Sequence, residues 1–210
     1  DAEAMFANGH FNGSVSGWDV GNVYNMTYMF ANNTTFNQPL TGWHTSSLHR
    51  LYAMFYGASS FNQNIGNLDL TNVYQMGPVL DQTAISPANY GLTLQGWAAA
   101  TPATGLSFSA SDRHYSSTAQ AARDKLTTPT NLSGFGWNIQ DAGSVVLPVD
   151  AQVTTWPTAS AINIGQALSL SSLTGGVASV SGTFSFDSPN VIPALGSYTA
   201  SVTFTPDNLD

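Results

Sequence analysis

The sequence has no cysteine and few charged residues. Without cysteine, disulfides and thiolate metal sites are excluded, while the redox compartment stays open. Charged side chains make up 8% of the 210 residues, far below the usual quarter. The polar surface must therefore come from Ser, Thr, Asn, Gln and Gly, a composition typical of secreted and cell-surface proteins. We predict an extracellular location on this basis.

Basic residues are scarcest: 4 Lys and Arg stand against 12 Asp and Glu, for a net charge of −8. An acidic surface repels phosphate backbones, so we expect no nucleic-acid partner. Apolar runs fall short of the about 18 residues that span a bilayer, so we expect no membrane insertion within this sequence. Because the chain starts in mid-repeat, we interpret it as a fragment of a longer polypeptide.

Catalytic and metal-binding motifs are also missing. The sequence has no Gly-x-Ser-x-Gly segment, no His-Glu-x-x-His pattern, no phosphate-binding glycine loop and no calcium loop. A pair of carboxylates for glycoside hydrolysis stays open as an alternative, because the separation of such a pair is spatial and does not show in the sequence. We expect no enzyme, no catalytic residue and no cofactor.

The first third of the chain does contain a repeat of 25 residues. Apolar or aromatic residues recur at this interval in five series: Phe11, Phe36 and Phe61; Trp18, Trp43 and Leu68; Val23, Leu48 and Val73; Met26, Leu51 and Met76; and the doublets Met29-Phe30, Met54-Phe55 and Val79-Leu80. A fixed period of this length indicates stacked coils that bury a shared core. We predict a solenoid over residues 1–82.

Each repeat has local signals for its elements. Met26, Met29 and Phe30 have the i, i+3, i+4 spacing of one helical face, which predicts a short helix. Residues 19–23 read as a short strand or an extended piece. An asparagine follows each recurring phenylalanine: Asn12, Asn37 and Asn62. We expect these side chains to hydrogen-bond the backbone of the adjoining coil.

Residues 83–146 lose the period and predict a cap that covers the open end of the solenoid. We expect a helix over Ser116 to Leu126, started by Ser116 or Ser117, and a last strand over residues 136–141. Residues 147–210 alternate apolar and polar side chains, as around Val202 and Phe204. This pattern predicts short strands and a small β-sandwich.

The repeat is similar to the BspA-type leucine-rich repeats of bacterial surface proteins. The residues that carry the likeness are Trp18-Asp19-Val20, Val23, Met26, Met29-Phe30 and Phe36-Asn37. The chain departs from this family pattern at two places: His44-Thr45 replaces the Asp-Val pair in the second repeat, and Leu68 replaces the tryptophan in the third. Two segments of the last 60 residues, Trp156 to Ile162 and Ser201 to Pro206, resemble immunoglobulin-like (Ig-like) modules of bacterial surface proteins. The resemblance implies adhesion and host or matrix binding, and it transfers no catalytic residue.

Two repeat positions each place three residues of interest on successive coils, and we call each such set of residues a column. Tyr24, His49 and Tyr74 form an aromatic column, predicted either to contact a ligand or only to cover the solenoid edge. The second column contains Asp19, His44 and Asp69. It is predicted as a solvated ladder, with a histidine held in its protonated form or a weak divalent-ion site as the alternatives.

The predicted fold class is an α+β repeat solenoid of leucine-rich-repeat type over residues 1–82, a cap over 83–146 and an all-β Ig-like sandwich over 147–210. The predicted function is non-catalytic binding or adhesion at a cell surface. Expected partners are a host or neighbouring-cell protein, matrix or polysaccharide. Alternatives are a stalk or filament component that binds copies of itself, or a carbohydrate-binding appendage of an enzyme.

Overall fold

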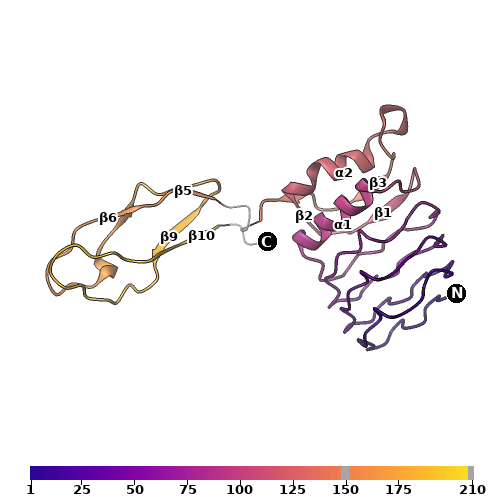
Figure 1. Cartoon of the computed structure of the whole chain (residues 1–210), viewed down its shortest axis with the longest axis horizontal. Helices are drawn as coiled ribbons and strands as arrows, with labels where there is room; N and C mark the ends of the chain where they lie inside the picture. Colours follow the sequence, from indigo (N-terminus) through magenta and orange to yellow (C-terminus); the bar gives the residue numbers. More distant parts are fainter. Residues whose placement is uncertain (148–151, 208–210) are drawn as a thin grey trace. The chain divides into compact units, whose positions relative to one another are not determined.

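The structure is a computed structural model that describes residues 1–147 and 152–207. The chain forms two compact units, Asp1–Val145 and Val146–Asp210. The fold is mixed α/β with small sheets, each of two strands among the described residues (Figure 1). The predicted repeats, 1–82, and all but the last residue of the predicted cap, 83–146, fall in the first unit. No helix in the described ranges has the length and apolar character needed to cross a membrane.

Residues 1–82 wind into coils joined by backbone hydrogen bonds between positions 23 to 26 residues apart. Met26 donates its N–H to the carbonyl of Arg50 at 2.8 Å, and Leu51 donates to that of Gln75 at 3.0 Å. Single parallel bridges pair Asn25 with Arg50 and Arg50 with Gln75. The indigo-to-magenta part of Figure 1 shows these coils lying one over another. The 25-residue interval of the sequence is therefore the interval at which the backbone pairs.

Phenylalanine rings stack through the interior of the coils. The ring centroids of Phe11 and Phe36 lie 6.4 Å apart, and those of Phe36 and Phe61 lie 6.0 Å apart. Phe30 stacks on Phe55 at 5.7 Å. These spacings lie within the 4.5–7 Å range of favourable aromatic pairs. Repeating one ring per coil therefore builds a continuous apolar core.

Asparagine side chains link the coils at the turn after each recurring phenylalanine. Asn12 Oδ1 accepts the N–H of Asn37 at 2.9 Å, and Asn37 Oδ1 accepts that of Asn62 at 2.9 Å. Asn62 Oδ1 continues the ladder by accepting the N–H of Ser86 at 2.8 Å. The predicted role of these asparagines is confirmed.

The predicted helix at Met26 and the predicted strand over residues 19–23 are wrong. The segment after Met26 forms tight turns instead, with the N–H of Met29 donating to the Met26 carbonyl at 3.1 Å. Tyr28 and Asn32 have φ angles of 55° and 54°. A left-handed residue at this spacing interrupts a right-handed helix. Residues 19–23 also turn, and the backbone pairs only beyond them.

The rest of the first unit closes the stack with helices and short strands. They are α1 Pro87–Ala99, β1 Ser107–Ser109, β2 Tyr115–Ser116, η1 Ser117–Ala119, α2 Gln120–Thr127, η2 Thr130–Leu132, β3 Asn138–Gln140 and β4 Ser144–Val145. β1 pairs with β3 and β2 with β4, both in parallel. The Ser116 side chain caps η1, which leads into α2, and β3 lies where the last strand was predicted. Because Gly77 donates its N–H to the carbonyl of Ser107 at 2.9 Å, β1 continues the coil pairing.

The second unit consists of strand pairs. Its elements are β5 Val153–Thr155, β6 Thr158–Ala159, η4 Leu168–Leu170, β7 Leu173–Thr174, β8 Val177–Ala178, β9 Gly182–Phe186 and β10 Val202–Pro206. All three pairs are antiparallel: β5 with β8, β6 with β7, and β9 with β10. Phe184 lies opposite Phe204 in the β9–β10 pair. Two packed multi-stranded sheets are not observed in the described part of this unit. Leu168 is its one buried apolar side chain there, so no thick core joins the pairs.

Candidate functional site

The structure brings Tyr24, His49 and Tyr74 together on the outside of the coils. Tyr24 and His49 stack with ring centroids 4.4 Å apart and planes 17° from parallel. His49 and Tyr74 meet edge to face at 6.0 Å and 68°. Tyr24 is 46% exposed and Tyr74 59%. The three side chains therefore form an exposed surface feature, and the name aromatic column is kept for Tyr24, His49 and Tyr74.

The aromatic column presents edges and hydroxyl groups more than a flat platform. Since Tyr24 and His49 lie face to face, each covers one ring face of the other. The hydroxyls of Tyr24 and Tyr74 lie 2.9 Å apart and share a hydrogen bond. That hydrogen bond is the largest of the effects that raise the pKa of Tyr24. The outer rim of the column is therefore a hydrogen-bonding surface.

The backbone holds the aromatic column in register. His49 donates its N–H to the carbonyl of Tyr24 at 2.9 Å, and Tyr74 donates to that of His49 at 3.1 Å. His49 Nδ1 lies 2.8 Å from the carbonyl oxygen of Ser47. In the neutral ring this contact assigns the proton to Nδ1 and leaves the Nε2 lone pair as an acceptor. The side chains are thus positioned before any ligand arrives.

A neighbouring column adds a positive charge that the sequence reasoning missed. Arg50 occupies the repeat position of Asn25 and Gln75, and its Nε donates to Gln75 Oε1 at 2.7 Å. It is the only Lys or Arg in residues 1–112. Its charge acts on Tyr24 in the direction that lowers the pKa, against the effect of Tyr74. The sequence does contain a signal for this charge, because Arg50 is the one basic residue at a repeat position that is otherwise uncharged, with Asn25 and Gln75.

The column of Asp19, His44 and Asp69 uses its carboxylates locally. Asp19 Oδ1 accepts the N–H of Gly21 at 3.1 Å, and Asp69 Oδ1 accepts that of Thr71 at 2.9 Å. Each aspartate thus closes its own turn. Within the described ranges, no three His, Asp or Glu side chains group in a way that could hold a metal ion, and this column is included in that finding.

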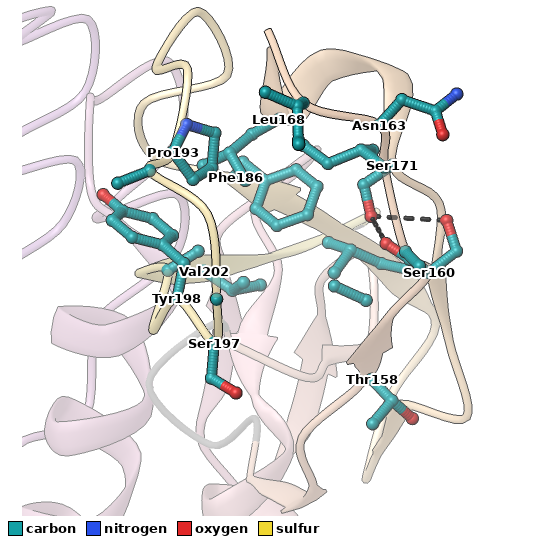
Figure 2. Close-up of a pocket in the computed structure, with 18 of the residues that line it drawn as sticks. Thr158, Ser160, Asn163, Leu168, Ser171, Phe186, Pro193, Ser197, Tyr198 and Val202 are labelled. Atoms are coloured by element: carbon teal, nitrogen blue, oxygen red, sulfur yellow. Dashed lines mark hydrogen bonds between the residues drawn. The ribbon is translucent and has the colours of Figure 1, made fainter. Parts of the chain in front are cut away.

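The second unit contains a hollow with a volume of about 590 Å³ (Figure 2). It lies between residues of β6 and β7 and residues of β9 and β10, and Phe186 and Leu168 form part of its wall. Ser171 Oγ donates to the carbonyl of Ser160 at 2.6 Å at one edge. None of the residues that line it is charged, so it offers no acid, base or anion-binding group. We interpret it as the loosely filled interior of this unit.

Comparison with known proteins gives one match, over the coils that carry the aromatic column. Residues 1–90 match the family described as "Mycoplasma protein of unknown function, DUF285". The matched part extends from the first coil into α1, and the description names a bacterial genus without a function. No curated protein and no solved structure matches the chain. The finer likeness to BspA-type repeats stays a prediction.

Proposed function

We propose that this chain is a non-catalytic binding module of a bacterial cell surface. In this proposal residues 1–82 are a leucine-rich-type solenoid, residues 83–146 its cap and residues 147–210 an Ig-like spacer. The partner is a protein of a host or neighbouring cell, the extracellular matrix or a polysaccharide. The observation that carries the proposal is the exposed aromatic column, held in register by the backbone of three successive coils.

The composition of this surface supports a binding role. Tyrosine and arginine are enriched among residues that dominate binding energy, and Arg50 lies in the column next to Tyr24 and Tyr74. Because ring stacking and the side-chain hydrogen bonds Tyr24–Tyr74 and Arg50–Gln75 already hold these side chains, little side-chain ordering is needed on binding. Repeat scaffolds allow such surface columns to vary while the core stays intact.

Self-association is the second candidate, and the surface of the second unit favours it. Ile164 is 78% exposed and Leu195 84%. Contiguous exposed apolar surface marks interaction sites, and Ile164 and Leu195 line the same hollow. In this case the module is part of a stalk or filament. Light scattering over a concentration series separates a chain that assembles from one that stays monomeric.

The test of the binding proposal is the double variant Tyr24→Ala/Tyr74→Ala. The 210-residue chain and the variant are compared on arrays of extracellular-matrix proteins and of glycans, with circular dichroism to confirm the fold. Loss of two central contacts predicts binding weaker by about 30-fold or more. Tyr198→Ala removes a comparably exposed tyrosine from the second unit and leaves binding unchanged. A double variant that keeps its fold and its full binding contradicts the proposal.

A further inference from the structure

A second, smaller hollow lies where the last coil meets the cap, with a volume of about 340 Å³. Its walls include Tyr52, Asp81, Ser109, Asn138 and Gln140, and we call it the Asp81 hollow. None of these residues belongs to the aromatic column. The volume is at the lower end of the range for small-molecule sites, so the hollow suits a small ligand or one unit of a longer one.

The carboxylate of Asp81 is fixed with one oxygen to spare. Ser109 Oγ donates to Asp81 Oδ1 at 2.7 Å, and the N–H of Ser111 donates to the same oxygen at 2.8 Å. The other oxygen, Oδ2, accepts no hydrogen bond from the described residues. An oriented carboxylate oxygen of this kind is ready to accept from a ligand hydroxyl.

Two carboxamides line the same hollow. Asn138 and Gln140 are two residues apart on β3, so their side chains share one face of the strand, while Ile139 between them is buried. Across the described ranges neither side chain has a hydrogen-bond partner within the chain. Each carboxamide offers both a donor and an acceptor. The hollow thus combines acceptors and donors that no other group in the described part of the chain satisfies.

A glycine allows an aromatic ring to form part of the wall. Gly77 has a φ of +67°, and a Cβ placed there would come within 2.5 Å of Tyr52 Cε2. The position therefore needs glycine both for its backbone conformation and for the ring that lies against it. The phenol hydroxyl of Tyr52 has no hydrogen-bond partner in the part of the chain that is described.

We propose that the Asp81 hollow binds a neutral sugar ring of a glycan. Sugar hydroxyls both donate and accept, so they match the free oxygen of Asp81 together with the amides of Asn138 and Gln140. The C–H face of a sugar matches the apolar wall at Tyr52. An anionic ligand is opposed by the Asp81 charge. A cation would pair with Asp81 and the amide oxygens but would leave the amide N–H donors of Asn138 and Gln140 without an acceptor. The site is separate from the aromatic column and does not depend on the column's role.

The test is an NMR titration of the ¹⁵N-labelled 210-residue chain with methyl pyranosides of glucose, galactose, mannose and N-acetylglucosamine. At least one of them is expected to give saturable shifts at the amides of Ser109, Ser111 and Gln140. The variant Asp81→Asn keeps the oxygen that Ser109 and Ser111 contact but replaces the free acceptor with a donor. It is expected to weaken binding tenfold or more.

Asp69→Asn is the matched control, because Asp69 also closes a turn through Oδ1 but lies outside the hollow. It should leave the titration unchanged. Absence of saturable shifts with all four pyranosides overturns the proposal, as does tighter binding of glucuronate or of a lysine peptide. In Tyr24→Ala/Tyr74→Ala the pyranoside shifts should persist. A failure of the aromatic column and a failure of the Asp81 hollow are therefore told apart.

Discussion

The hydroxyl oxygens of Tyr24 and Tyr74 lie 2.9 Å apart, although 50 residues separate them in the chain. The intervening coil contributes His49, whose ring stacks on Tyr24 and meets Tyr74 edge to face. Three successive coils therefore each contribute one side chain to the same small surface. The two hydroxyls behave as a pair, since the bond to Tyr74 is the main cause of the raised pKa of Tyr24.

The variant Tyr74→Phe removes this hydrogen bond and should bring the pKa of Tyr24 down toward the ordinary value of about 10. With the Tyr74 hydroxyl gone, two smaller effects on the pKa of Tyr24 remain: desolvation, which raises it, and the charge of Arg50, which lowers it. The pKa is measured by NMR titration of tyrosines carrying ¹³C at the ring Cζ. Tyr28→Phe is the control and should leave the pKa of Tyr24 unchanged. An unchanged Tyr24 midpoint in Tyr74→Phe would show that the hydroxyl contact is not maintained in solution.

The asparagine ladder should contribute measurably to stability. Asn37 Oδ1 accepts from the N–H of Asn62 and from the side chain of Gln63. Asn37→Ala leaves that backbone N–H unpaired and should lower the free energy of unfolding by about 1–3 kcal/mol, measured by urea denaturation. Asn22→Ala, at an exposed site, should change it by less than about 0.5 kcal/mol. Equal effects of the two variants would mean that the ladder adds no stability.

The repeat made much of the coil architecture predictable. The spacing of Phe11, Phe36 and Phe61 predicted rings in register, and the asparagines after them predicted the ladder. The helix predicted at Met26 failed because its spacing fits a series of tight turns as well as a helix. The positive φ angles at Tyr28 and Asn32 separate the two. Asparagine is enriched at positive φ, but a tyrosine gives no sequence signal for it.

The candidate sites were predictable only where they follow the period. Tyr24 and Tyr74 share a repeat position, so the aromatic column followed from the spacing. The bond between their hydroxyls did not, since it depends on the tilt of each ring past His49. The Asp81 hollow also joins a coil to β1 and β3, which have no repeat that relates them to Asp81. Contacts of that kind arise from the packing of the cap and are not contained in the periodicity.

A buried polar cluster holds α1 and α2 to the last part of the cap. Asp141, whose side chain is 3% exposed, accepts from Arg123 Nε at 3.3 Å and from the hydroxyl of Tyr90 at 3.0 Å. Asp141→Ala leaves both donors without this acceptor and should cost about 3 kcal/mol of unfolding free energy. Asp124→Ala removes an exposed carboxylate of α2 and should cost under about 1 kcal/mol. A small effect of Asp141→Ala in thermal or urea unfolding would contradict a structural role for the cluster.

The same cluster predicts a loss of stability in alkali. Burial, followed by the charge of Asp141, raises the pKa of Tyr90 far above its ordinary value, while the unfolded chain ionises this tyrosine near pH 10. Below that pH its contribution is constant. Above it the unfolded state binds fewer protons than the folded state, so the free energy of unfolding falls by up to about 1.4 kcal/mol per pH unit. Tyr90→Phe should flatten this fall by the equivalent of one proton in urea unfolding at a series of pH values above 10. Tyr198→Phe, at an exposed tyrosine, should keep the wild-type slope, and an equally steep slope in Tyr90→Phe would refute the assignment.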